Sequence, residues 1–190
     1  MKMHLRCFDT LRSKELVIKP AVETSDIQGF LSKIRKANIK LLYLDPKLVG
    51  DHDFKIIYPS DQADIVICET IEELKKLKSL KRSCGFVKKV SSNDDLEEII
   101  AASYVGPDLV IIETTNWKII PLENIIARLH KSGIKIFTTA NSVDEVRTMF
   151  AVLELGTDGV IFTTDDDKQV TDLGTTLEKI SLPLQAARII

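Results

Sequence analysis

Residues 108–130 read DLVIIETTNWKIIPLENIIARLH and join an apolar, strand-like run to an amphipathic helical pattern. The run that starts at Leu109 ends at Glu113, and the only tryptophan of the chain, Trp117, follows. Pro121 then opens the helical pattern, where a missing amide proton is tolerated because the first turn leaves it unpaired anyway. The stretch therefore predicts a strand-to-helix unit with polar side chains at its seam, as in α/β folds.

The same kind of unit recurs along the chain. Short β-branched runs begin near residues 16, 39, 54, 64, 85, 109, 134 and 159, and most of them are continuously apolar. Such runs are expected for parallel strands that are buried on both faces. Helical patterns lie between most of the runs, and capping-box spacing at Ser25, Thr70 and Ser142 marks three helix starts.

This alternation predicts a compact, degenerate (β/α)8 TIM-like barrel of parallel strands. The links KLVGDHD and SDQAD around the third strand are shorter than the roughly 10 to 12 residues of a helical crossover. Either two helices have been lost from a barrel, or the strands form an open doubly wound α/β sheet, and we favour the barrel. Because 190 residues suit one sizeable core, we expect residues 1–190 to form a single α/β domain.

Composition and charge argue against several classes of protein. With 26 basic and 28 acidic residues the net charge is -2, so electrostatics imply no nucleic-acid or membrane partner. No apolar stretch reaches transmembrane length, and MKMHLRCFDT lacks the core of a signal peptide. Cys7, Cys68 and Cys84 form no CxxC pair, so we expect a reduced, cytoplasmic protein. The isolated histidines predict no metal site.

Polar side chains recur where the apolar runs end. In barrels of this type the catalytic groups project from the carboxyl ends of the strands. The residues at these ends are Lys19, Asp45, Glu69, Lys88, Glu113, Thr138, Thr139, Thr163 and Thr164. Any one of them is explained by a strand that becomes polar as it leaves the core. As a set that converges on one rim, they predict a site for a polar, anionic substrate.

Lys19 and Lys88 are candidate amines, because desolvation at the end of a buried run lowers the pKa of an ammonium group. The alternative is a lysine stem that covers apolar surface with its head in water. Glu113 is a candidate general acid or base, or else a cap for the next helix. GTDGV at 156–160 indicates a helix stop and a strand start, and the absence of GxGxxG leaves no dinucleotide fingerprint.

ETTNWKIIPLENIIARL (113–129) and NSVDEVRTMFAVLELGTDGVIF (141–162) resemble the signature of the archaeal-type (type II) 3-dehydroquinate synthases. That resemblance implies NAD-dependent oxidative deamination of 2-amino-3,7-dideoxy-D-threo-hept-6-ulosonate and ring closure to 3-dehydroquinate. This reaction belongs to the shikimate pathway of aromatic amino acid biosynthesis. The implied protein is an oxidoreductase that acts on a small sugar acid with NAD as cofactor, without a Rossmann fingerprint.

Site residues follow from the family signature together with the strand ends. We expect Glu113, Lys118 and Lys19 to be catalytic. The expected substrate-binding residues are Asn116, Trp117, Glu123, Asn124, Lys88 and Thr139. Glu123 is expected to hold backbone amides of the loop and Trp117 to wall the pocket. The working amine is left open among three lysines, Lys19, Lys88 and Lys118, and no motif indicates the NAD-binding residues.

Two features support an alternative from a different class of protein. Asn116 stands where the family signature has aspartate, and the glycine-rich C-terminal domain of the family has no counterpart here, so we expect that domain to be absent. The apolar, strand-like ISLPLQAARII (180–190) predicts a partner chain or missing domain that covers it. The alternative is therefore a catalytically silent relative that binds a sugar acid or a partner. A third hypothesis is a barrel enzyme that acts on a phosphorylated substrate.

Overall fold

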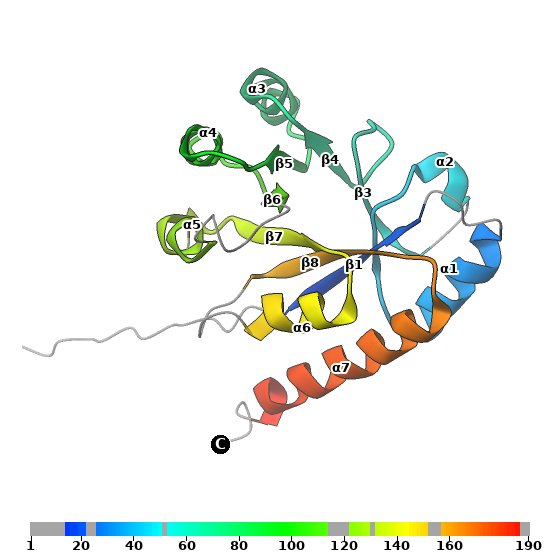
Figure 1. Cartoon of the computed structure of the whole chain (residues 1–190). Coiled ribbons are helices and arrows are strands. Elements are labelled where there is room, and N and C mark those ends of the chain that lie inside the picture. Colours follow the sequence, from blue (N-terminus) through cyan, green and yellow to red (C-terminus); the bar gives the residue numbers. More distant parts are fainter. Residues whose placement is uncertain are drawn as a thin grey trace, which may run out of the picture.

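The computed structural model describes residues 14–21, 26–50, 53–113, 122–129, 132–151 and 157–186 (Figure 1). The strands are β1 (Glu15–Pro20), β2 (Leu41–Leu42), β3 (Lys55–Tyr58), β4 (Ile65–Cys68), β5 (Cys84–Lys89), β6 (Leu109–Glu113), β7 (Lys135–Ala140) and β8 (Gly159–Thr164). The helices are α1 (Ile27–Lys36), α2 (Pro46–Val49), α3 (Ile71–Ser79), α4 (Asn93–Ser103), α5 (Leu122–Leu129), α6 (Val143–Ala151) and α7 (Asp167–Ala186).

The strands are all parallel and close into a barrel in sequence order. Closure is made by β8 and β1, whose six residue pairs run from Glu15 opposite Gly159 to Pro20 opposite Thr164. The predicted (β/α)8 barrel is therefore confirmed, and the open doubly wound sheet is excluded because an open sheet leaves two unpaired edges. All eight predicted strands are present.

The short links around β3 have reduced helical content, in line with a barrel that has lost helices there. Among the described residues between β2 and β3 the helix is the single turn α2, and residues 59–64 between β3 and β4 contain no helix. Asp45 accepts a hydrogen bond from the Lys47 amide at 3.0 Å and so caps α2. This strand-end residue therefore has a structural role.

Two of the three predicted helix starts are confirmed. The Thr70 hydroxyl accepts from the Glu73 amide at 3.2 Å, and the Ser142 hydroxyl accepts from the Glu145 amide at 3.1 Å. At the first helix the carboxylate of Asp26 does the capping, and Ser25 lies outside the described residues. Either side chain satisfies amides that the first helical turn leaves unpaired.

Two apolar layers explain why the strand runs are continuously hydrophobic. Alternate residues of each strand face the barrel interior, which is filled by Val17, Ile57, Ile65, Ile67, Val87, Leu109, Ile111, Phe137 and Ile161. The residues between them face the helices and form the larger outer core. Gly159 makes room for this packing, because a Cβ atom there would lie 2.6 Å from the ring of Phe137.

One hydrogen bond is repeated before three of the even-numbered strands. The segments ADIVI, PDLVI and TDGVI start β4, β6 and β8, and each carries an aspartate whose carboxylate accepts from a backbone amide near the start of the preceding strand. The bonds join Asp64 to Ile56 (2.7 Å), Asp108 to Cys84 (2.9 Å) and Asp158 to Ile136 (2.8 Å). The TDGV segment is therefore a strand start, as predicted, and its aspartate ties β8 to β7.

The carboxyl-terminal segment differs from the prediction. Residues 180–186 continue helix α7, so the strand-like interpretation of this stretch is wrong; residues 187–190 lie outside the described part. The apolar spacing of Val170, Leu173 and Leu177 sets a helical face that packs on the barrel, and helix growth from that face overrides local strand preference. Gly174 lets α7 approach α1 closely, because a Cβ atom there would lie 2.7 Å from the carbonyl oxygen of Ala37.

Helix α4 begins with a capping box that gives the fold a measurable pH dependence. The Asp95 carboxylate accepts hydrogen bonds from the backbone amides and the hydroxyls of Ser91 and Ser92. These bonds lower the pKa of Asp95 from 3.8 to about 2. A depressed pKa contributes stability that is complete above the unfolded-state value and is lost as pH falls through the folded-state value.

We therefore expect wild-type stability to fall between pH about 4 and about 2 by an increment that Asp95→Asn lacks. Urea unfolding across this pH range measures the free energy of unfolding of both proteins. Subtracting one from the other cancels the contribution of the other carboxylates, which the two proteins share. Identical pH dependence of the two proteins would contradict the capping role.

Candidate functional site

The alternation of side chains along each strand sorts the strand-end residues into two groups. Counting in steps of two from the barrel interior, Lys19, Glu113, Thr139 and Thr163 face inward at the carboxyl ends of their strands. Glu69 continues the inward series directly after β4. Two residues that the sequence did not single out, Tyr43 and Lys89, join them. We call this ring of Lys19, Tyr43, Glu69, Lys89, Glu113, Thr139 and Thr163 the mouth.

Lys19 and Tyr43 are in direct contact within the mouth. The Lys19 ammonium lies 5.0 Å from the centroid of the Tyr43 ring, which is a cation–π arrangement. The Tyr43 ring also packs edge-on against Tyr58, with centroids 5.7 Å apart. Burial, followed by the negative charges of Glu113, Tyr58 and Glu69, raises the pKa of Tyr43 to about 12. Its hydroxyl is therefore protonated at neutral pH and is a hydrogen-bond donor there.

Lys89 and Glu113 are neighbours across two strands. β5 and β6 pair in parallel with Lys89 opposite Glu113, so an ammonium and a carboxylate project from adjacent strands on the inner side. With Lys19, Tyr43 and Glu69, the mouth offers two cations, two carboxylates and a phenol. This set can bind an anionic group, accept a proton and donate a hydrogen bond.

The structure does not bring Lys88 to the mouth. Its side chain points outward, donates to the Glu98 carboxylate of α4 and lies 3.8 Å from the Asp95 carboxylate. The hydrogen bond to Glu98 raises the pKa of Lys88, whereas the sequence-based hypothesis for this amine needed a lowered value. The carboxylates of Glu98 and Asp95 raise the pKa of Lys88 by more than desolvation lowers it, because both approach the ammonium on a partly exposed surface.

The remaining strand-end threonines also face the outer layer. Thr164 donates to the Gln169 side chain at 2.8 Å and accepts from the Asp166 amide, so it serves the start of α7. Thr138 is fully buried, and its hydroxyl has no hydrogen-bond partner among the residues described. Neither threonine reaches the mouth.

The tryptophan stretch can be placed only in part. Asn116, Trp117 and Lys118 lie outside the described residues, as does the side chain of Glu123. Asn124 is exposed on the first turn of α5, and Glu113 anchors the start of the stretch at the mouth. Of the predicted site residues, the structure thus brings together Lys19, Glu113 and Thr139.

Two features that the described residues lack bear on the class of site. No group of three or more His, Cys, Asp or Glu side chains there is arranged to hold a metal ion. Within the same ranges, no helix is both long and apolar enough to cross a membrane.

Sequence comparison places the chain beside a known family. Residues 12–177 match the 3-dehydroquinate synthase II N-terminal domain. A 3-dehydroquinate synthase of Nitrosopumilus maritimus is 41% identical over 181 residues, which cover 94% of this chain and 50% of that protein. One from Cenarchaeum symbiosum is 37% identical over 165 residues, covering 87% and 48%. The chain thus spans about half the length of these relatives.

Comparison with solved structures supports the barrel. A truncated 3-deoxy-D-arabino-heptulosonate 7-phosphate synthase of Thermotoga maritima superposes with a TM-score of 0.61 at 11% identity, over 90% of this chain and 88% of that one. Phosphoribosylanthranilate isomerase of the same organism gives 0.59 at 10% identity, over 85% and 98%. At such low identity these similarities show the fold alone.

Proposed function

The chain belongs to the 3-dehydroquinate synthase II N-terminal domain family, and we propose that it is the substrate-binding barrel of such a synthase. The proposed reaction is NAD-dependent oxidative deamination of the amino-heptulosonate sugar acid and ring closure to 3-dehydroquinate. One observation carries the proposal: Glu113, the first residue of the family-like tryptophan stretch, lies in the same ring as Lys19, Tyr43 and Lys89.

The chemistry of the mouth suits such a substrate. A sugar acid presents a carboxylate, several hydroxyls and, before deamination, an amine. Lys19 and Lys89 are placed to pair with the carboxylate, and the protonated Tyr43 hydroxyl is placed to donate to a carbonyl oxygen. Glu113 is the inward-facing carboxylate of β6 and accepts a proton from a hydroxyl or ammonium group of the substrate.

Three helix starts around the mouth do not fit the diphosphate of a dinucleotide. Helices α3, α4 and α6 begin at this end of the barrel, and a helix start binds phosphate through unpaired amides and its positive dipole. Here capping side chains already occupy such amides. Each first turn also carries two carboxylates: Glu72 and Glu73, Asp94 and Asp95, and Asp144 and Glu145. We therefore derive no step through NAD from these residues.

The alternative function is that of a catalytically silent relative that binds the sugar acid or a partner polypeptide. Asn116, which replaces a carboxylate of the family signature, favours it, because an amide does not take up a proton at neutral pH.

The two functions are separated by one experiment. The purified chain is incubated with NAD and the amino-heptulosonate substrate, alone and with the carboxyl-terminal half of the Nitrosopumilus maritimus relative, and NADH formation is followed. Turnover in either mixture supports the enzyme. Saturable binding of the sugar acid without turnover in both mixtures supports the silent relative that binds the sugar acid. Neither binding nor turnover overturns the enzyme and the sugar-acid-binding relative.

The neighbouring lysines of β5 provide a matched pair of variants. We expect Lys89→Met to lower kcat/KM by about 10- to 100-fold, the effect of losing a charged hydrogen bond to substrate. Lys88→Met removes the same charge one residue away, on the outer face, and is expected to stay close to wild type. If only binding is measurable, the dissociation constant replaces kcat/KM. A larger loss in Lys88→Met than in Lys89→Met contradicts the inward assignment of Lys89.

A further inference from the structure

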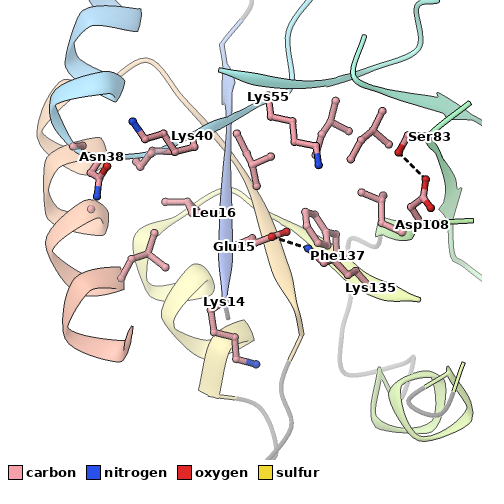
Figure 2. Close-up of a pocket in the computed structure, with 18 residues that line it drawn as sticks. Lys14, Glu15, Leu16, Asn38, Lys40, Lys55, Ser83, Asp108, Lys135 and Phe137 are labelled. Carbon is pink, nitrogen blue, oxygen red and sulfur yellow. Dashed lines mark hydrogen bonds and ion pairs between the residues drawn. The ribbon is translucent and has the colours of Figure 1, made fainter. Parts of the chain in front are cut away.

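A concave site lies at the end of the barrel opposite to the mouth. A cavity of about 810 Å³ opens at the amino-terminal ends of the strands and extends to α7 (Figure 2). Its lining includes the first residues of β1, β3 and β7, which are Glu15, Lys55 and Lys135. Cavities of roughly 300–1,000 Å³ are the usual size of small-molecule sites.

The cavity has an apolar wall. The half-buried Leu41 and Leu177 face it from β2 and α7, and Ile65 contributes from the start of β4. The buried side chains of Ile57 and Phe137 lie behind them in the barrel interior. An apolar body of a ligand would therefore replace water against hydrocarbon on several sides.

Several of the charged groups around this wall have partners. The Lys135 ammonium lies 2.7 Å from the Glu15 carboxylate. The Asp108 carboxylate accepts from the Ser83 hydroxyl at 2.7 Å and from the Cys84 amide at 2.9 Å (Figure 2). For the ammonium of Lys55, no hydrogen bond or ion pair is formed with any residue that the structure describes.

The Lys55 side chain also points into the cavity. Lys55 occupies an inward-facing position, two residues before the interior Ile57, and its ammonium points into the cavity toward the side of Phe137 (Figure 2). Lys40, which precedes β2, lines the same cavity but directs its ammonium away from it (Figure 2). The cavity therefore combines apolar walls with an inward-pointing cation that has no ion-pair partner among the residues that the structure describes.

We propose that this cavity binds a small amphipathic anion. The ligand has an aromatic or aliphatic body that packs against Leu41, Ile65 and Leu177, and a single carboxylate, sulfonate or phosphate that pairs with Lys55. The site uses none of the residues of the mouth, so it stands or falls independently of the proposed enzymatic function.

The test uses two probes that differ only in charge. Anilinonaphthalene sulfonate has an aromatic body and one anionic group, and N-phenylnaphthylamine is the same body without the sulfonate. Fluorescence titration of the folded chain with each probe measures a dissociation constant. We expect one saturable site that prefers the anionic probe, with a preference that added salt weakens.

The variants locate the anion. Lys55→Met keeps a long, apolar side chain, and because Lys55 is exposed the variant is expected to fold, which circular dichroism checks. Lys55→Met should raise the dissociation constant of the anionic probe about fivefold, as loss of an exposed ion pair does, and leave that of the neutral probe unchanged. Lys75→Met on the exposed face of α3 is the matched control and should change neither. Absence of a saturable site, equal losses in the two variants, or no loss in Lys55→Met overturns the proposal.

Discussion

Glu113→Gln is expected to abolish turnover while the barrel stays folded. Glutamine keeps the shape of the side chain but removes the negative charge and the capacity to take up a proton. Loss of a general acid or base lowers the rate by about 10²- to 10⁴-fold. The rate of NADH formation measures the effect, in whichever mixture the wild-type chain turns over, and circular dichroism with thermal unfolding reports whether the fold is retained.

A second measurement distinguishes a role in the mouth from a structural one. The charge of Glu113 is among the causes that raise the pKa of Tyr43, so Glu113→Gln should move that pKa down toward its ordinary value. Spectrophotometric titration of the phenol follows this shift, with Tyr43→Phe identifying the Tyr43 contribution. A purely structural glutamate far from Tyr43 would leave the titration unchanged.

The matched control for this variant is Glu98→Gln. Glu98 is a carboxylate near the same end of the barrel, but it lies on α4 and pairs with the outward-facing Lys88. We expect nearly normal turnover in Glu98→Gln. Equal losses in the two variants would mean that the reaction responds to net charge alone, and a normal rate in Glu113→Gln would remove Glu113 from the site.

The barrel itself was predictable because its physical signal is carried by whole segments. Eight apolar runs that alternate with helical patterns leave few arrangements, and burial on both faces requires parallel strands covered by helices. The shortened link before β3 and the helix-free link after it did not obscure this pattern, because the strands on either side kept their composition. The correct choice between barrel and open sheet rested on the strand number, which the pairing of β1 with β8 confirms.

The same double burial made the site harder to predict. A run that is apolar on both faces carries no alternation, so the sequence does not say which of Lys88 and Lys89 faces inward. Tyr43 lies within the apolar run that begins near residue 39, although an aromatic hydroxyl at the end of a strand is a signal that could have identified it. Side-chain direction is set by barrel closure, which becomes visible only with the strand register.

The aspartates that join neighbouring strands are expected to contribute measurably to stability. Asp158 is only 9% exposed, and its carboxylate accepts from the Ile136 amide inside the barrel end. In Asp158→Ala that amide has no acceptor and little access to water. A buried donor left unsatisfied costs about 1–3 kcal/mol, so we expect Asp158→Ala to lower the free energy of unfolding by about 3 kcal/mol. Urea unfolding measures it.

Two companion variants separate the hydrogen bond from other effects of the substitution. Asp158→Asn keeps an acceptor oxygen in nearly the same place, so it should recover much of the loss. Asp64 makes the corresponding bond to Ile56 but is exposed, so water replaces its carboxylate in Asp64→Ala and the expected loss is about 1 kcal/mol or less. If burial of the amide sets the cost, the loss of unfolding free energy decreases in the order Asp158→Ala, Asp158→Asn, Asp64→Ala. Equal losses for the two alanine variants would show that the bond contributes through strand pairing alone, independent of its access to water.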